Sequence, residues 1–188
     1  ATHAGITVGE DGATHQCNED LALMRTIPGM VVINPADDVE AQAAVKAAYE
    51  HQGPVYIRFG RLAAPIVNDA PDYKFELGKG VTLKDGKDVT IIATGLEVAY
   101  ALKAADMLEK DGISARVINI HTIKPLDVDL VVKAAKETGK IVTVEEHSVI
   151  GGLGSAVCDA LAENCPTPVC KIGVNDQFGE SGPAVELI

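Results

Sequence analysis

Short apolar runs alternate with longer helical segments along most of this chain. The pattern predicts strands at Gly80–Leu83, Val89–Ala93, Ala115–Ile120, Ile141–Glu145 and Val169–Ile172, and helices at Glu97–Lys110, Asp127–Glu137 and Ser155–Glu163. Gly112 and Gly139 stand where helices should end, because glycine readily adopts the left-handed conformation that closes a helix. Strands and helices that alternate at this spacing are typical of a mainly parallel sheet covered by helices. We therefore expect a complete α/β domain in the second part of the chain.

The first part of the chain shows the same alternation in an incomplete form. Met30–Ile33 and Val55–Arg58 read as strands, and Asp37 and Glu40 have the spacing of a helix capping box between them. A strand–helix–strand unit normally makes a parallel pair with a right-handed crossover. Two parallel strands alone would leave both sheet edges open. We therefore expect the end of a larger α/β sheet whose first strands are missing.

An irregular segment separates the two parts. Arg61–Phe75 contains two prolines and a polar Asn68-Asp69 pair, as linkers between domains often do. The predicted domains are therefore residues 1–70 and 71–188. The chain begins Ala-Thr-His, without an initiator methionine, so we expect an ordered remnant or one piece of a longer polypeptide.

Composition excludes several classes of function. The 188 residues are 47% hydrophobic and 23% charged, which is ordinary for a globular protein. A formal charge of -11 argues against non-specific nucleic-acid binding. No apolar run approaches the roughly 18 residues that suggest a membrane span. The four cysteines lack Cys-x-x-Cys spacing and no secretory signal is visible, so we expect reduced thiols in a cytoplasmic protein without a membrane partner.

The segment Thr2–Gln16 is unlike the rest of the chain. It contains two histidines, two carboxylates and three glycines: His3, His15, Glu10, Asp11, Gly5, Gly9 and Gly12. Such a stretch is a poor core element, because buried polar groups need partners. Its glycines let the backbone turn sharply or approach a ligand closely. We interpret it as an active-site loop.

The motifs of this loop resemble a signature segment of transketolases. The similarity rests on Thr2-His3, Val8-Gly-Glu-Asp-Gly12 and Thr14-His-Gln16. Further matches follow in the same order: Leu23-Met-Arg-Thr-Ile-Pro28, Asn34-Pro-Ala-Asp37, Tyr56-Ile-Arg58, Glu145-Glu-His147 and Gly151-Gly-Leu-Gly-Ser155. The chain departs from the pattern at Ala4-Gly5, where Asp-Ser is frequent, and at Ala13, where proline is usual.

The resemblance covers essentially the whole chain and is to the C-terminal half of the enzyme. It implies an incomplete thiamine-diphosphate-binding domain of the pyrimidine type, followed by a complete, mainly parallel α/β C-terminal domain. A split transketolase would carry this half as its C-terminal subunit.

The resemblance also implies roles for the loop residues. His15 would contact substrate hydroxyls and assist proton transfer, a task that suits an imidazole near neutral pH. His3 would lie beside the reactive carbon of the thiazolium ring and bind the terminal hydroxyl of the donor, so it would be both catalytic and cofactor-binding. Asp11 would accept a hydrogen bond from a sugar hydroxyl, because an ionised carboxylate only accepts.

Two arginines are further candidates for binding substrate. Arg58 stands at the C-terminal end of a predicted strand, the edge where open α/β sheets bind ligands. A guanidinium binds phosphate bidentately, and the resemblance implies that Arg58 binds the sugar phosphate; a surface ion pair is the alternative. Arg25 is the weaker candidate, because the corresponding arginine faces substrate only in the related deoxyxylulose-phosphate synthases.

Other motifs favour structural interpretations. Gly151–Ser155 precedes a helix and could bind a phosphate on free amides, but it lacks the spacing of a dinucleotide or P-loop motif. Tight strand-to-helix packing explains it better. His121 and His147 are predicted to be structural, and no cluster has metal-site spacing.

The function that the resemblance implies is transfer of a two-carbon ketol unit from a ketose phosphate to an aldose phosphate. In the family, most groups that bind thiamine diphosphate and Mg²⁺ lie before the first residue of this chain. We therefore expect the chain to be inactive alone and to pair with an N-terminal half or subunit in a homodimer-type assembly.

The alternatives are a 1-deoxy-D-xylulose-5-phosphate synthase, a 2-oxo acid dehydrogenase β-type subunit, or a non-catalytic binding fragment. The synthases usually show Asp-Arg-Ala-Gly where this chain has Thr-His-Ala-Gly, which favours transketolase.

Overall fold

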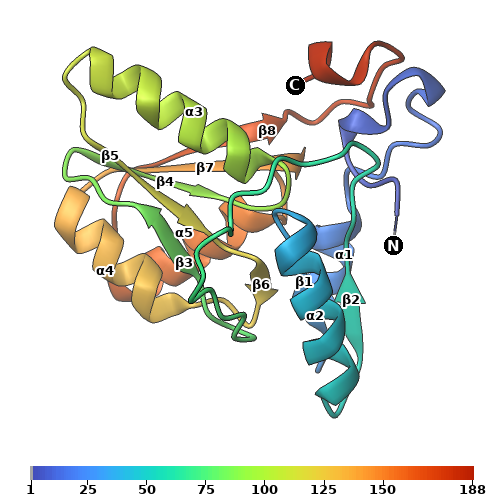
Figure 1. Cartoon of the computed structure of the whole chain (residues 1–188), viewed down its shortest axis with the longest axis horizontal. Helices are drawn as coiled ribbons and strands as arrows, with labels where there is room; N and C mark the ends of the chain where they lie inside the picture. The colour runs from blue at the N-terminus through green and yellow to red at the C-terminus, as the bar shows by residue number, and fades with distance from the viewer. Residues whose placement is uncertain (1) are drawn as a thin grey trace.

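The computed structural model describes residues 2–188 and contains two β-sheets with helices packed against them (Figure 1). The smaller sheet has the strand order β2 (Val55–Ile57), β1 (Val31–Ile33), β6 (Thr122–Lys124). The larger sheet has the order β3 (Val81–Lys84), β5 (Ala115–Asn119), β4 (Val89–Ala93), β7 (Ile141–Ser148), β8 (Val169–Val174). The helices are η1 (Ile6–Asp11), α1 (Asp20–Thr26), α2 (Asp38–Glu50), α3 (Glu97–Lys110), α4 (Val128–Thr138), α5 (Leu153–Asn164) and η2 (Ala184–Glu186).

The larger sheet confirms the predicted mainly parallel α/β domain. Strands β5, β4, β7 and β8 run parallel, and β3 pairs antiparallel with β5 at one edge. Helix α3 covers one face, while α4 and α5 cover the other (Figure 1). Ile91 and Ile92 show why both faces are apolar. Successive strand residues point to opposite faces, so Ile91 packs in the cluster of α3 and Ile92 in the cluster of α4 and α5.

The predicted unit β1–α2–β2 is also present. Strands β1 and β2 pair in parallel, with Val32 opposite Tyr56. Asp37 caps α2, because its side chain accepts a hydrogen bond of 2.9 Å from the backbone N–H of Glu40. The Glu40 carboxylate in turn accepts from the N–H of Ala36 at 2.7 Å. The helix therefore begins where the spacing of Asp37 and Glu40 indicated.

A strand that the sequence analysis did not predict covers one edge of this pair. Strand β6, from the second part of the chain, pairs antiparallel with β1 and places Thr122 opposite Ile33. Next to this pair, the N–H of Asn34 donates to the carbonyl of His121 at 2.8 Å. The His121 side chain is fully buried, with its ring centroid 4.2 Å from that of Phe75. A three-residue strand is too short to show a periodicity, so the sequence pattern missed it.

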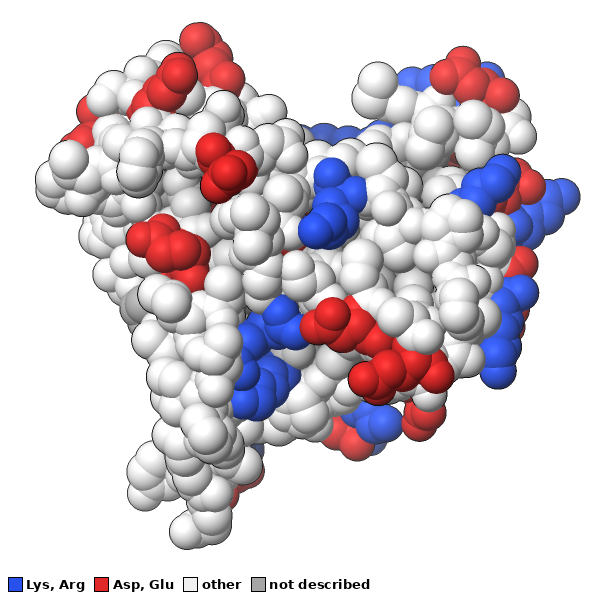
Figure 2. All heavy atoms as spheres, turned by 180° about the vertical axis from the view of Figure 1, so that it is seen from behind, with Lys and Arg blue, Asp and Glu red and all other residues white. Residues whose placement is uncertain are grey.

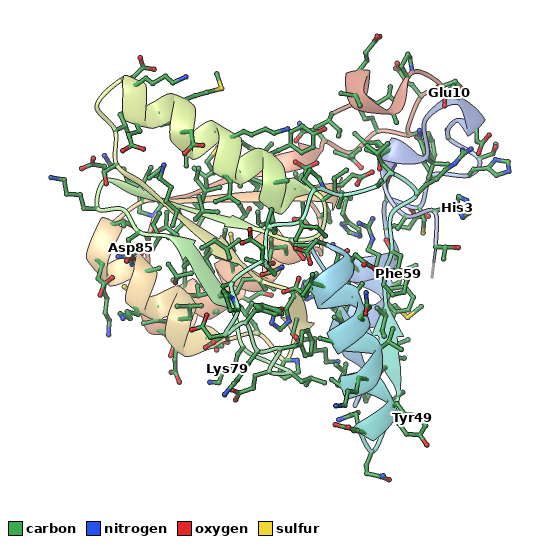
Figure 3. All side chains as sticks on the ribbon, in the orientation of Figure 1. His3, Glu10, Tyr49, Phe59, Lys79 and Asp85 are labelled. Carbon is green, nitrogen blue, oxygen red and sulfur yellow. The ribbon has the colours of Figure 1, made fainter. Side chains whose placement is uncertain are left out.

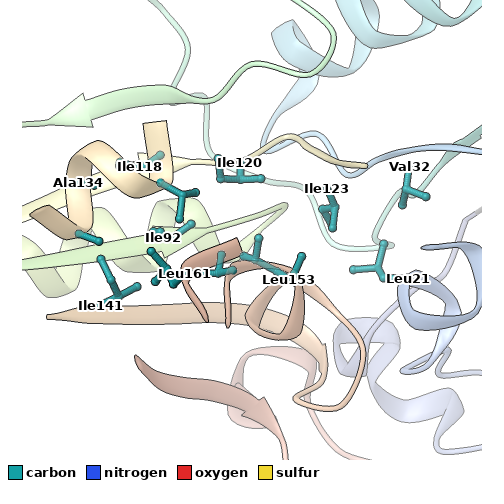
Figure 4. Packing of buried hydrophobic residues seen from close by; sticks show 14 residues of the cluster. Leu21, Val32, Ile92, Ile118, Ile120, Ile123, Ala134, Ile141, Leu153 and Leu161 are labelled. Atoms are coloured by element: carbon teal, nitrogen blue, oxygen red, sulfur yellow. The ribbon is translucent and has the colours of Figure 1, made fainter. Parts of the chain in front are cut away.

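One apolar core joins the two parts of the chain (Figure 4). It combines Leu21 from α1 and Val32 from β1 with Ile123 from β6 and with Leu153 at the start of α5. All four side chains are essentially inaccessible to solvent. Burial of this shared surface stabilises the arrangement of the two sheets, since each buried aliphatic side chain contributes about 1.5–3 kcal/mol. Among the described helices, none has the length and apolar character needed to cross a membrane.

Candidate functional site

The polar segment near the N-terminus is an ordered loop built around the short 3-10 helix η1. Gly5, Gly9 and Gly12 have φ values of 80°, 77° and 76°, a conformation that glycine adopts without strain. The N–H of Gly12 donates to the carbonyl of Gly9 at 3.0 Å, and the N–H of His15 donates to the carbonyl of Gly12 at 3.0 Å. We call residues 2–16 the η1 loop.

Two other segments hold the η1 loop in place. The N–H of Ala4 donates to the carbonyl of Phe59, just after β2, at 3.2 Å. The Gln16 amide donates to the carbonyls of Ile6, at 3.1 Å, and of Glu180, at 2.8 Å. Helices η1 and η2 consequently lie side by side at one end of the molecule, although they come from opposite ends of the chain (Figure 1). The loop is therefore fixed by long-range contacts.

The two histidines predicted to be catalytic are exposed on this loop. His3 adopts φ 62°, which is unusual for a residue other than glycine, and its Nδ1 lies 3.2 Å from Thr2 Oγ1. His15 Nδ1 lies 3.0 Å from Thr14 Oγ1. Figure 3 shows His3 at the outer margin of the molecule, with Glu10 farther along the same loop. Both imidazoles are accessible to a ligand or a partner chain.

Asp11 pairs with an arginine that the sequence interpretation missed. Arg61 Nη1 forms an ion pair with Asp11 Oδ2 and also donates to the carbonyl of Val8 at 3.0 Å. The side chains of Arg61 and Asp11 are 45% and 43% exposed. Arg61 lies just beyond the C-terminal end of β2, and this position was the signal that could have identified it. We call these two residues the Arg61–Asp11 pair.

The cavity nearest to the η1 loop is lined by other residues than the predicted catalytic groups. A cavity of about 300 Å³ lies beside the η1 loop. Its lining includes Ile6, Glu97 and Glu146, and none of His3, Asp11 and His15. The loop therefore presents its polar groups on an open surface.

The structure corrects the prediction for Arg58. Its side chain is only 3% exposed, and Nε forms an ion pair with Asp20 at 2.9 Å. Nη2 donates to the carbonyls of Cys17, at 3.1 Å, and Glu146, at 2.9 Å. A phosphate would have to break these internal contacts and leave the buried Asp20 carboxylate unpaired, which is costly. Arg58 is thus a structural residue that joins β2 to α1 and β7.

Arg25 is partly exposed and also makes contacts within the chain. Its Nη1 donates to the carbonyls of Gly151 and Gly152, the latter at 3.0 Å. Its Nη2 lies 3.5 Å from a carboxylate oxygen of Asp159 on α5. The guanidinium therefore connects α1 to the turn before α5, and substrate binding by Arg25 stays a prediction.

The glycine-rich turn before α5 binds a carboxylate of the protein itself. The backbone N–H groups of Leu153 and Gly154 donate to Glu145 at 2.7 and 2.8 Å. A Cβ at Gly152 would overlap the same carboxylate, so glycine is required there. His147, which follows on β7, is fully buried and accepts from the N–H of Ala22 at 3.4 Å. Both observations support the structural interpretation of these motifs.

Buried carboxylates lie beneath the η1 loop. Burial raises the pKa of Glu97, at the start of α3, to about 7, and the nearby Glu146 carboxylate raises it further. Burial also raises the pKa of Glu146, whereas hydrogen bonds from Thr7 oppose the rise.

On the surface, acidic and basic side chains are interspersed over the face shown in Figure 2.

Comparison with known proteins identifies the family. Residues 1–66 match the pyrimidine binding domain of transketolase, and residues 78–188 match the transketolase C-terminal domain. The chain belongs to the transketolase family.

Its relatives include proteins named as transketolase subunits. It is 49% identical over 178 residues to the 6-deoxy-6-sulfo-D-fructose transketolase subunit SqwH of Clostridium sp. (strain MSTE9), covering 95% of this chain and 55% of the relative. It is 48% identical over 183 residues to a subunit of the apulose-4-phosphate transketolase of Phocaeicola vulgatus, covering 97% of this chain and 58% of the relative.

A solved structure agrees with this assignment. It is described as "Split gene transketolase, inactive beta4 tetramer", and it matches with a TM-score of 0.91 and 56% identity over 100% of this chain and 59% of that chain. The present chain thus spans somewhat more than half the length of these relatives.

Proposed function

We propose that this chain is the C-terminal part of a thiamine-diphosphate-dependent transketolase that moves a two-carbon ketol unit from a ketose phosphate to an aldose phosphate. The observation that carries the proposal is the exposure of His3 and His15 on the η1 loop, together with the exposed Arg61–Asp11 pair. The relatives that are named as transketolase subunits support it.

The chemistry of the exposed groups suits a phosphorylated sugar. His15 and His3 would hold or move protons at ring nitrogens close to the sugar hydroxyls. The Asp11 carboxylate would accept a hydrogen bond from a hydroxyl, and the Arg61 guanidinium would bind the phosphate. Exposed ion pairs contribute only about 0.2–1 kcal/mol, so a substrate can separate the Arg61–Asp11 pair at little cost. Arg61 thereby takes the role first expected of Arg58.

Only part of a cofactor site fits within this chain. When bound, thiamine diphosphate supplies the electron sink for carbon–carbon cleavage, and exposed His3 is the residue suited to lie beside it. The glycine-rich turn does not fit a diphosphate, because Glu145 occupies its amides. Residues 2–188 contain no group of three or more His, Cys, Asp or Glu placed to hold a metal ion. We infer that the diphosphate and Mg²⁺ are held by the N-terminal half or subunit.

The assembly proposed here contains this chain, an N-terminal subunit and a second copy of both, in the cytoplasm. The open position of the η1 loop supports the need for a partner, since its two histidines and Asp11 line no part of the adjacent cavity.

An assay of the reconstituted complex tests the function. The chain would be combined with the N-terminal half or subunit, Mg²⁺ and thiamine diphosphate, and supplied with xylulose 5-phosphate and ribose 5-phosphate. We expect ketol transfer from the complex and none from the chain alone. Replacing His15 with Asn should lower kcat by about 10²-fold or more, the scale of general acid–base catalysis.

The second candidate is a 1-deoxy-D-xylulose-5-phosphate synthase. The synthase of Heliobacterium modesticaldum is 41% identical over 184 residues, although the match covers only 28% of that protein. Pyruvate and glyceraldehyde 3-phosphate provide the decisive assay. Activity on that pair, with none on the two pentose phosphates, would replace our proposal with this candidate.

A further inference from the structure

A carboxylate of the C-terminal domain holds the η1 loop from beneath. Glu146, on β7, accepts two hydrogen bonds at the same oxygen, Oε1: one from the backbone N–H of Thr7 at 2.5 Å and one from Thr7 Oγ1 at 2.6 Å. The two residues are 139 positions apart in the sequence. Thr7 is 2% exposed and Glu146 is 6% exposed, so these bonds are shielded from water.

This contact takes the place of a normal helix cap. Thr7 is the second residue of η1, and the first N–H groups of a helix have no partner inside it. A side chain at the N-cap position usually accepts from them, but here that position is Gly5, and no side chain caps the helix from it. The Glu146 carboxylate, which belongs to the other domain, therefore accepts the hydrogen bond that a capping side chain would usually accept.

Gly5 is the residue that lets the loop approach so closely. Its φ is 80°, and a Cβ at this position would overlap the Glu146 carboxylate. The chain departs from the usual family pattern at this same position, where serine is frequent. The departure is thus explained by the carboxylate that lies against the backbone there.

The backbone of Glu146 is anchored as well. The buried Arg58 donates to the Glu146 carbonyl at 2.9 Å while it pairs with Asp20. The carboxylate and the carbonyl of one residue are therefore both tied to the first part of the chain. Such an arrangement limits the movement of Thr7 relative to both sheets.

The contacts continue from Thr7 to the exposed polar groups. Val8, the next residue, accepts at its carbonyl from Arg61 at 3.0 Å, and the same Arg61 nitrogen pairs with Asp11. The direction of the Val8 carbonyl depends on the peptide unit that follows Thr7. A shift of Thr7 would therefore displace the Arg61–Asp11 pair.

We propose that Glu146 is a positioning residue of the C-terminal domain, which acts through Thr7 and Val8 to orient the Arg61–Asp11 pair for a phosphorylated substrate. The inference depends on the proposed function for its substrate. It gives the C-terminal domain a definite task in the site: to hold the loop on which the substrate-binding groups lie.

Three variants of the full chain test the link, each assayed in complex with the N-terminal subunit. Thr7→Val removes only the hydroxyl donor, Glu146→Gln removes the charge, and Thr7→Ser keeps both donors. Thr7→Val and Glu146→Gln should each raise KM for the phosphorylated donor about tenfold, the scale of one hydrogen bond to a charged group, with kcat changed less than about threefold. Thr7→Ser should behave as wild type. The effects of Thr7→Val and Glu146→Gln should be less than additive when they are combined, because both act on the same contact between Thr7 and Glu146.

A second substrate and a second readout separate positioning from a general loss of structure. An unphosphorylated ketose donor should show a smaller rise in KM than the phosphorylated donor, because it can use Asp11 but not Arg61. In the isolated chain, NMR should show shifted amide signals of Val8 and Gly9 and a shifted Arg61 Nε–H signal in Glu146→Gln. Glu163→Gln, an exposed glutamate on α5, is the matched control and should leave these signals in place.

The results that would overturn the positioning role differ from those that would overturn the proposed function. Equal rises in KM for both donors, or unshifted loop signals in Glu146→Gln, would overturn the positioning role. If the wild-type complex lacks transketolase activity, the proposed function fails, whereas the NMR comparison still decides whether Glu146 orients the loop.

Discussion

Replacing Glu97 with Gln should make the stability of this chain less dependent on pH. The Glu97 side chain lies at the start of α3, is 5% exposed and borders the cavity that Glu146 also lines. Burial, together with the Glu146 charge, raises its pKa from 4.5 to about 7. Its carboxylate is thus poorly solvated when ionised, and the folded chain favours the protonated form.

The sign and the size of the effect follow from this pKa. Because the pKa in the folded state is above that in the unfolded state, the stability that protonated Glu97 contributes is fully present below pH 4.5. It is lost as the pH rises through about 7. Each tenfold change in proton affinity is equivalent to roughly 1.36 kcal/mol. The free energy of unfolding therefore falls by about 3 kcal/mol between low and high pH. For a chain of this size, that corresponds to roughly 6–12 °C in Tm.

Urea denaturation at about pH 4 and about pH 8 measures the effect directly. Glu97→Gln should match wild type at the lower pH and exceed its free energy of unfolding by about 3 kcal/mol at the higher pH. The exposed Glu163→Gln variant should follow wild type at both values, because its side chain is solvated in both states. Parallel curves for Glu97→Gln and wild type would show that Glu97 ionises without penalty, and the reasoning from burial would be refuted.

Three further substitutions test the core and the two arginines. Arg58→Met should lower the free energy of unfolding by about 3–5 kcal/mol in urea, because it leaves the buried Asp20 carboxylate unpaired; a change below about 1 kcal/mol would contradict the internal ion pair. Arg61→Ala should leave Tm within about 2 °C of wild type, since the lost pair is exposed, and should raise KM for sugar phosphates at least tenfold in the complex. An unchanged KM would remove Arg61 from the site. Leu153→Ala should cost about 2–5 kcal/mol because it opens a cavity in the shared core, and a two-step unfolding curve in wild type would argue against one joined core.

Local patterns predicted most of the secondary structure correctly. The capping pair Asp37 and Glu40 marked the start of α2, and Gly139 closes α4 in the left-handed conformation, as its position indicated. These features depend on neighbours within about four residues, so the sequence contains all that is needed to recognise them. Family membership was recognisable for a related reason: the matching motifs keep their order along the whole chain.

The sites were harder to predict, because a residue type does not reveal its partner. Arg58 and Arg61 are both arginines near the end of β2, yet one is buried against Asp20 and the other is exposed beside Asp11. Only the packing of α1 and β7 over the strand end decides between them. A sequence motif can therefore predict which residue types lie at a sheet edge without predicting the role of each side chain.

The sequence alone determined the class of fold, the polar character of the η1 loop and the family, since each is encoded by residues close together or in a preserved order. Tertiary structure alone decided that β6 joins the small sheet, that Glu145 fills the glycine-rich turn and that Glu146 holds Thr7. These contacts join segments that lie far apart along the chain. They form because burying a carboxylate or a strand edge is favourable only when the partner that satisfies it arrives from elsewhere in the fold.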